Sequence, residues 1–230
     1  MCGRFTIISD PTTYQMEFDI PMDADIKDKW KVSYNISPAQ VIPVVTDANK
    51  RNIELMQWGL LPTWAKDGRN KVMLINVRAE TILEKITFRK LLQQGQRCFI
   101  LADGFYEWQP STQKGKPKTP FYFHLKDNKP FAFAGIWEAG KMHENQNIKT
   151  CAIITCVPNS LVNMIHNRMP VILDRSSSWE WISQKPIPQL LPLLKPYPEK
   201  DMISFPVSSL ANNPNSNAPE CILSAASNTH

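Results

Sequence analysis

The chain has 230 residues, of which 43% are hydrophobic and 20% are charged, a composition that suits one compact domain and excludes disorder as the main state. No apolar run approaches the roughly 20 residues that a membrane-spanning helix needs, and the first residues lack the pattern of a signal peptide. We therefore expect a cytoplasmic protein that does not contact membranes. The net charge of +5 permits a polyanionic partner but does not require one.

Apolar and aromatic runs predict at least five strands, at residues 41–45, 98–101, 121–125, 131–137 and 151–156. The later strands are separated by short polar stretches at 126–129 and 139–149, which favours hairpins and antiparallel pairing. Helical spacing or capping residues predict short helices at 79–94, 158–165, 176–182 and 186–196, followed by an irregular tail from residue 212. We expect an α+β fold: a single domain with a mostly antiparallel, barrel-like β core and short peripheral helices.

Cys2 stands directly after the initiator methionine, whereas the other four cysteines are scattered without a C-x-x-C pair. This pattern predicts neither a disulfide framework nor a structural zinc site. No two histidines have the spacing of metal ligands, so we expect no metal and no other cofactor.

Removal of Met1 would expose an amine and a thiol on the same residue, and bacterial methionine aminopeptidases generally cleave before a small residue such as Cys2. Near neutral pH roughly a quarter of such amines and several per cent of such thiols are in nucleophilic form. An amine that adds to an aldehyde forms an imine, and the neighbouring thiol can then close a thiazolidine ring. The alternative is that Cys2 is only a small residue at the start of a buried strand.

A polar residue stands two positions before an arginine in three segments: Cys2-Gly3-Arg4, Asn76-Val77-Arg78 and His166-Asn167-Arg168. Residues two apart point the same way from a strand, so convergence of these segments would place three arginines around a thiol, an amide and an imidazole. Arginine forks match phosphate oxygens well, and such a pocket would suit a phosphate-bearing ligand. An ordinary surface ion pair is the alternative for each arginine taken alone.

Glu107 is flanked by aromatic residues, which would raise the pKa of its carboxyl group and suit it to general acid catalysis. A strand-edge carboxylate paired with a lysine is the alternative. His166 falls in a helix end or loop, where it could transfer protons or serve as a structural histidine. We expect Trp58 to be buried and Trp64 to lie nearer the surface, where bases of a single strand could stack on it.

Motifs in a fixed order over about 220 residues make the chain resemble the SOS response-associated peptidase family, also called abasic-site processing proteins. The matching motifs are Met1-Cys2-Gly3-Arg4-Phe5, Tyr34-Asn35-Ile36-Ser37-Pro38, Trp58-Gly59-Leu60, Asn76-Val77-Arg78-Ala79-Glu80-Thr81, Ala102-Asp103-Gly104-Phe105-Tyr106-Glu107-Trp108, His166-Asn167-Arg168-Met169-Pro170, and Pro206-Val207-Ser208 followed by Asn212-Asn213-Pro214. The resemblance implies a family domain at residues 1–220, with 221–230 as a C-terminal tail.

The resemblance also implies an activity: after removal of Met1, Cys2 bonds to the ring-opened abasic site in single-stranded DNA, ends as a thiazolidine, and shields the lesion. Abasic-site lyase and self-processing activities would accompany this crosslink. The implied catalytic residues are Cys2, Asn76, Glu107 and His166. The implied DNA contacts are Arg4, Asn35, Trp64, Arg78 and Arg168. We expect a monomer in the bacterial cytoplasm that associates with the nucleoid during repair.

Two positions depart from the usual motifs, Val77 and Asn167, and the second could alter how His166 is oriented. The helix after Thr81 matches less well, which leaves Lys85 and Arg89 doubtful as DNA contacts. Two other functions remain open: a cysteine peptidase that acts on other proteins, with Cys2 as nucleophile and His166 as base, and a non-covalent binder of single-stranded DNA.

Overall fold

The computed structural model describes residues 2–61, 73–111, 113, 115, 117–141 and 147–225. Its strands are β1 (Phe5–Ile7), β2 (Ser33–Ile36), β3 (Val41–Val45), β4 (Ile53–Trp58), β5 (Asn76–Arg78), β6 (Arg97–Ala102), β7 (Gly104–Gln109), β8 (Thr119–Leu125), β9 (Phe131–Lys141), β10 (Asn147–Cys156), β11 (Met169–Pro170), β12 (Ile172–Leu173) and β13 (Met202–Pro206). The α-helices are α1 (Pro11–Phe18), α2 (Ala24–Lys29), α3 (Ile86–Gln93), α4 (Ser160–Asn163), α5 (Arg175–Trp181) and α6 (Ile187–Leu190). The 3₁₀ turns are η2 (Ala79–Thr81), η3 (Leu191–Leu193), η4 (Glu199–Asp201), η5 (Ser209–Asn212) and η6 (Pro219–Ile222).

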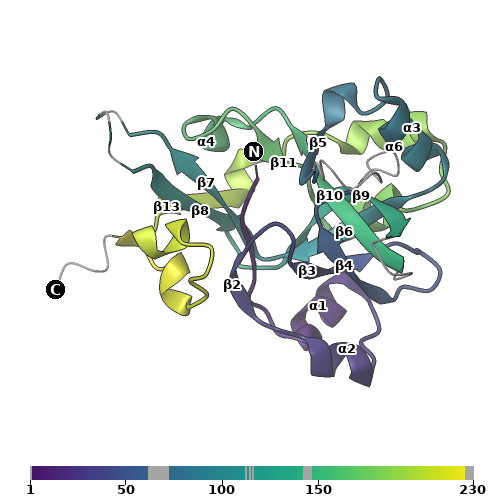
Figure 1. Cartoon of the computed structure of the whole chain (residues 1–230), viewed down its shortest axis with the longest axis horizontal. Helices are drawn as coiled ribbons and strands as arrows, with labels where there is room; N and C mark the ends of the chain where they lie inside the picture. The colour runs from purple at the N-terminus through teal and green to yellow at the C-terminus, as the bar shows by residue number, and fades with distance from the viewer. Residues whose placement is uncertain are drawn as a thin grey trace.

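A closed barrel forms one half of the molecule (Figure 1). Its strands follow one another in the order β10, β4, β3, β6 and β9, and β9 pairs with β10 again to close the ring. The strands β5, β11 and β12 extend this sheet. Most pairings are antiparallel, and β10 pairs in parallel with β4 and β5. The predicted α+β class with a barrel-like, mostly antiparallel core is confirmed.

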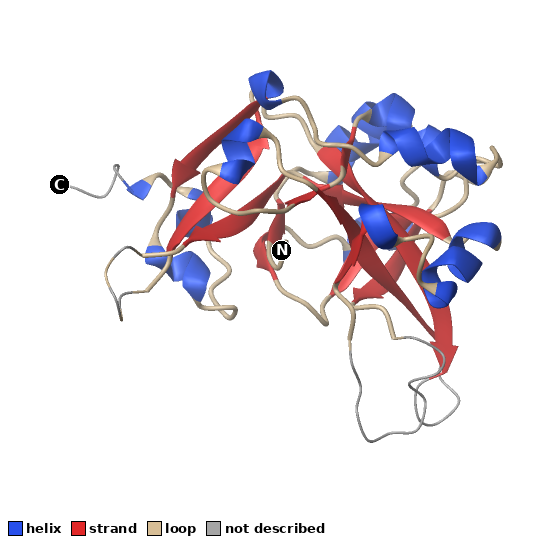
Figure 2. Cartoon of the chain, turned by 90° about the horizontal axis from the view of Figure 1, so that it is seen from above, coloured by secondary structure: helices blue, strands red, loops and turns tan. Residues whose placement is uncertain are grey.

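A second sheet lies beside the barrel, with the strand order β13, β8, β7, β1, β2 (Figure 1). The two sheets share a core, because the Phe5 ring of β1 lies 5.1 Å from the Trp58 ring and 5.6 Å from the Phe133 ring, both on barrel strands. Trp58 is fully buried, as the sequence predicts. The N-terminal end of the chain therefore enters between the two sheets, where Figure 2 also places it.

The expected hairpin across residues 126–129 is wrong, whereas the hairpin of β9 and β10 is confirmed. β8 pairs with β7 and β13 in the smaller sheet, and β9 pairs with β6, β10 and β12 in the barrel sheet. The short connection crosses between sheets because both strands have apolar faces that meet in the shared core: Phe123 stacks on Phe105, whose ring contacts Phe133. A hairpin would need the two strands to share one sheet.

The single helix expected at 79–94 is also wrong, since η2 and α3 are separate elements. Ile82 is buried between them, but Leu83 is 37% and Ile86 is 74% exposed, so these apolar residues do not share one helical face. The helix at α5 is capped by Asp174, whose Oδ1 accepts from the Ser177 N–H at 2.8 Å, rather than by the predicted serines.

The chain after β13 packs against the outer face of the smaller sheet. Its turns η5 and η6 contribute Ala211 and Ile222 to a second apolar cluster that contains Tyr106 and Tyr122. Cys221, the first residue of the predicted tail, is fully buried. In the described ranges no helix is long and apolar enough to cross a bilayer.

Candidate active site

Cys2 is held where the two sheets meet. It is fully buried, and Asn76 of β5 donates from Nδ2 to its carbonyl oxygen at 2.8 Å. The Cys2 thiol lies 3.9 Å from the Arg4 carbonyl oxygen. Burial raises the pKa of this thiol well above its usual range, and the negative charge of Glu107 raises it further. The thiol is therefore protonated at neutral pH.

Glu107 is a buried carboxyl group, 2% exposed, in the middle of β7. Side chains alternate along this strand, so Phe105 and Glu107 face the barrel while Tyr106 and Trp108 face the second cluster. Burial raises the pKa of Glu107 to about 7. The predicted upward shift is confirmed, and near neutral pH this group can either donate or accept a proton.

His166 faces Glu107 from the loop between α4 and β11, with its Nε2 atom 3.9 Å from the Glu107 carboxylate. His166 Nδ1 lies 3.1 Å from the Arg168 backbone nitrogen and 3.3 Å from the Arg168 carbonyl oxygen, so the Arg168 backbone holds the ring with its Nε2 atom toward Glu107. Burial lowers the pKa of His166, and the positive charges of Lys118 and Arg168 lower it further. Asn167 is exposed. The ring is oriented by the backbone of Arg168.

The four residues predicted as catalytic lie together, although they come from four separate segments of the chain. Cys2 precedes β1, Asn76 is in β5, Glu107 is in β7 and His166 is in a loop. Asn76 bonds to Cys2, Glu107 acts electrostatically on the Cys2 thiol, and His166 faces Glu107. We call these four residues the Cys2 cluster. It combines a thiol with a proton donor and acceptor poised near neutral pH.

Arg4 is positioned by neutral groups. Its Nη1 atom donates to Asn35 Oδ1 at 2.8 Å and to the Ala211 carbonyl at 3.2 Å, and its guanidinium lies 5.5 Å from the Trp108 ring centre. Asn35 is 1% exposed, and its Nδ2 donates to the carbonyl oxygens of Asn213 and Ser216. Within the described ranges no carboxylate pairs with Arg4, so its positive charge remains uncompensated.

The other two predicted arginines differ from Arg4 and from each other. Arg78 is exposed, and it forms no ion pair with any residue that the structure describes. Arg168 is 12% exposed and forms a two-pronged pair with Glu80, at 2.7 and 2.8 Å. Of the segments that carry these arginines, only β5 is a strand, so the argument from strand alternation applies to Asn76 and Arg78 alone.

The Cys2 cluster and the three arginines do not account for every residue that was predicted or that contacts them. Trp64, predicted as a DNA contact, lies outside the described residues. No sequence pattern predicts the role of Lys118, whose charge acts on both Glu107 and His166, or the contact of Trp108 with Arg4. Glu80 stands in a quoted motif, but nothing in the sequence pairs it with an arginine 88 residues away.

A groove of about 620 Å³ opens beside the Cys2 cluster. Asn76 and Arg78 of β5 line it together with Lys85 and Phe88. Asn76 therefore faces both Cys2 and this groove. Lys85, doubtful as a DNA contact from the sequence, lies in the same groove as Arg78.

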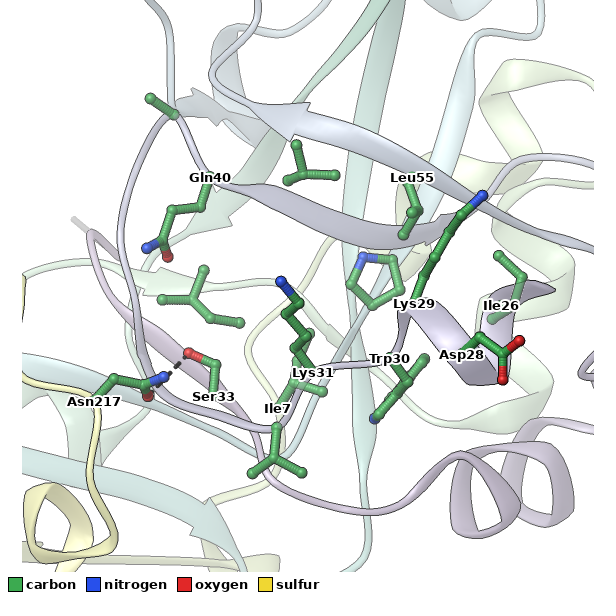
Figure 3. Close-up of a pocket in the computed structure, with 15 residues that line it drawn as sticks. Ile7, Ile26, Asp28, Lys29, Trp30, Lys31, Ser33, Gln40, Leu55 and Asn217 are labelled. Carbon is green, nitrogen blue, oxygen red and sulfur yellow. Dashed lines mark hydrogen bonds between the residues drawn. The ribbon is translucent and has the colours of Figure 1, made fainter. Parts of the chain in front are cut away.

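A larger groove of about 800 Å³ is lined by side chains of α2 and the connection that follows it, of β1, β2, β3 and β4, and by Asn217. Figure 3 draws these side chains. This groove shares no lining residue with the Cys2 cluster. All five cysteines are buried free thiols. Among the described residues no group of three or more His, Cys, Asp or Glu side chains is arranged to hold a metal ion.

Comparison with known proteins matches residues 1–214 to the model of the family described as "SOS response associated peptidase (SRAP)". The chain is 41% identical over 225 residues to "Abasic site processing protein YoqW" of Bacillus subtilis, covering 96% of this chain and 99% of that protein. It is 30% identical over 223 residues to "Abasic site processing protein HMCES" of Xenopus tropicalis, covering 85% of this chain and 67% of that one. A crystal structure of a protein from Bacteroides thetaiotaomicron has the same fold, with a TM-score of 0.83, 24% identity, and coverage of 97% of this chain and 100% of that chain.

Proposed function

Because this chain belongs to the SOS response associated peptidase (SRAP) family, we propose that it processes abasic sites in single-stranded DNA by forming a covalent crosslink through Cys2. The observation that carries the proposal is the Cys2 cluster, in which the residue behind Met1 lies beside a carboxyl group with a pKa of about 7. The relatives named as abasic site processing proteins support the choice of substrate.

The proposed reaction starts once Met1 has been removed. The amine of Cys2 adds to the aldehyde of the ring-opened sugar, and loss of water gives an imine. The Cys2 sulfur then bonds to the imine carbon, and the thiol proton moves to the nitrogen, which closes a thiazolidine. One aldehyde and one aminothiol thus give one ring and one water, with no oxidant or reductant required.

Each member of the cluster has a role that fits its position. Glu107, with a pKa of about 7, donates a proton to open the sugar and to release water, and accepts one when the amine adds. His166 presents its Nε2 atom toward Glu107, and it contacts the opened sugar. Asn76 holds the Cys2 carbonyl through Nδ2. Its Oδ1 is buried without a hydrogen-bond partner among the described residues, which leaves it available to accept from the exposed amine.

The raised pKa of the Cys2 thiol favours this order of steps over peptide cleavage. A cysteine peptidase attacks with a thiolate, and its cysteine usually has a lowered pKa beside a protonated histidine. Here both pKa shifts run the other way, because burial raises the pKa of the Cys2 thiol and lowers the pKa of His166. The thiol is therefore protonated and His166 is neutral. In the imine route the thiol is needed only after the imine has formed, and the reaction itself consumes the thiol proton.

DNA would reach the cluster along the groove that Asn76 and Arg78 line. We propose that Arg4 and Arg78 contact phosphates, since neither pairs with a carboxylate among the described residues. Asn35 would support the phosphate contact by holding the Arg4 side chain in place, and Trp64 would stack on a base. Lyase activity, self-processing, a monomeric state and a role near the nucleoid belong to the same proposal.

A direct test mixes processed protein with a single-stranded oligonucleotide that carries one abasic site. We expect a protein-DNA band that survives denaturation, and its loss in Cys2→Ala. Cys98→Ala is the matched control, because Cys98 is also a fully buried free thiol but lies in β6 of the barrel, outside the cluster. Absence of the band with wild-type protein, or its persistence in Cys2→Ala, would contradict the proposal. If the protein only binds DNA non-covalently, Cys2→Ser should keep its affinity for DNA, and no variant should give the denaturation-resistant band.

A further inference from the structure

The Arg4 side chain leaves one edge of its guanidinium group open. Its Nη1 atom donates to Asn35 Oδ1 at 2.8 Å and to the Ala211 carbonyl oxygen at 3.2 Å. Among the residues that the structure describes, Nε and Nη2 have no hydrogen-bond partner. These two atoms form the edge of the fork that matches two phosphate oxygens side by side. The orientation of the guanidinium plane therefore decides how well this edge meets a phosphate.

Trp108 of β7 packs against the same guanidinium. The Arg4 Cζ atom lies over the indole ring, 5.5 Å from its centre. This contact is attractive because the face of an aromatic ring carries the negative part of its charge distribution. A guanidinium that lies on a fixed ring is itself restrained, so whatever fixes the Trp108 ring also acts on Arg4.

Asn212 fixes this ring from η5. Its Oδ1 atom accepts a hydrogen bond from Trp108 Nε1 at 2.6 Å, and because an indole N–H can only donate, the amide oxygen must face it. The preceding residue, Ala211, supplies the carbonyl oxygen that Arg4 binds, so one turn contacts both partners. The turn is anchored, since Ala211 is fully buried and its N–H donates to the Ser208 carbonyl oxygen at 3.2 Å.

We infer that Asn212 is a positioning residue for DNA binding: by holding the Trp108 indole, it keeps the Arg4 guanidinium oriented with its open edge toward a phosphate. The inference rests on the proposed function, in which Arg4 contacts a phosphate, and adds to it a residue that acts through Arg4. Within the described ranges Asn212 makes no hydrogen bond to the Cys2 cluster. Its removal should therefore lower DNA affinity and leave the crosslinking rate at saturating DNA unchanged.

A role through Arg4 can be separated from a direct contact with DNA and from a general loss of structure. If Asn212 acts through Arg4, its removal has no further effect once Arg4 is alanine, but it keeps its full effect when Arg78 is alanine. If Asn212 or Trp108 binds DNA independently of Arg4, or if the fold is weakened, the losses add in both backgrounds.

The test measures affinity, by fluorescence anisotropy, for single-stranded DNA that carries a tetrahydrofuran analogue of the abasic site, which has no aldehyde. We expect Asn212→Ala to bind about three- to tenfold more weakly than wild type, the loss that corresponds to one hydrogen bond of ordinary net strength. Arg4→Ala and the double variant with Asn212→Ala should bind equally weakly, whereas Arg78→Ala and Asn212→Ala together should show both losses. Asn215→Ala is the matched control, because Asn215 is an exposed asparagine of the same segment that bonds to Asn213 through its backbone N–H.

Nitrogen NMR of the free protein gives a readout without DNA. Asn212→Ala should shift the Trp108 indole N–H and the Arg4 Nε–H signals while the other signals of the fold persist, and Asn215→Ala should shift neither. Unchanged affinity in Asn212→Ala, a loss that adds to that of Arg4→Ala, or an Arg4 signal that does not move would overturn the inference. If wild-type protein forms no crosslink, the proposed function fails, and the NMR comparison still decides whether Asn212 positions Arg4.

Discussion

Replacing Glu107 with glutamine should stabilise the protein at high pH while it removes the chemistry. The raised pKa means that the native state binds the proton more tightly than the unfolded chain, whose ordinary value for this group is 4.5 against about 7 in the native protein. Native stability therefore falls as pH rises from the unfolded pKa to the folded pKa, and the loss is complete above about pH 7. A difference of about 2.5 units corresponds to about 3 kcal/mol.

The glutamine side chain in Glu107→Gln has the same shape as glutamate and never ionises, so this variant does not lose native stability as pH rises. In urea unfolding, the free energy of unfolding of Glu107→Gln relative to wild type should rise by about 3 kcal/mol between pH 4 and pH 8.5. Crosslinking by this variant should be lost at both pH values. Glu199→Gln is the control, because Glu199 is an exposed carboxylate in η4, and its relative stability should change little over the same range. A relative stability of Glu107→Gln that does not rise with pH would refute the reasoning.

Three further predictions concern binding, positioning and the core. Asn76→Ala removes the bond to the Cys2 carbonyl and should slow crosslinking on the order of tenfold in a gel time course, with unchanged affinity for the tetrahydrofuran analogue. Arg78→Ala should weaken DNA binding and reduce the salt dependence of log affinity by about one unit, as fluorescence anisotropy at several salt concentrations would show; an unchanged slope would exclude a phosphate contact. Trp58→Ala should lower the free energy of unfolding by about 3–5 kcal/mol in urea titration, because the ring is fully buried and its Nε1 donates to the Ile75 carbonyl at 3.0 Å.

The barrel strands were predictable because their residue composition is typical of buried β-strands. The runs at β3, β6, β9 and β10 are dense in β-branched and aromatic residues and are almost wholly buried. Their partners were not predictable in every case. The chain after β8 is short enough for a hairpin, yet it crosses to the barrel because Phe123 and Phe133 pack into one core from different sheets. Local patterns record which residues are apolar, but not which sheet buries them.

The Cys2 cluster was largely predictable for a different reason. A cysteine behind the initiator methionine and a glutamate among aromatics have distinctive chemistry, and the family motifs join them to Asn76 and His166. What the sequence could not supply was the state of each group. The buried, protonated thiol, the orientation of the His166 ring toward Glu107 and the pairing of Arg168 with Glu80 follow from three-dimensional contacts between distant segments.

The central claim is that Cys2 becomes part of a thiazolidine with the abasic-site aldehyde. Intact mass spectrometry of the product formed by processed protein and a single-stranded abasic oligonucleotide tests it most directly. The account predicts a species with the combined mass of the protein without Met1 and the oligonucleotide, less one water, that resists borohydride because no imine remains. A product that borohydride reduces, a crosslinked chain that still carries Met1, or no covalent species at all would contradict it.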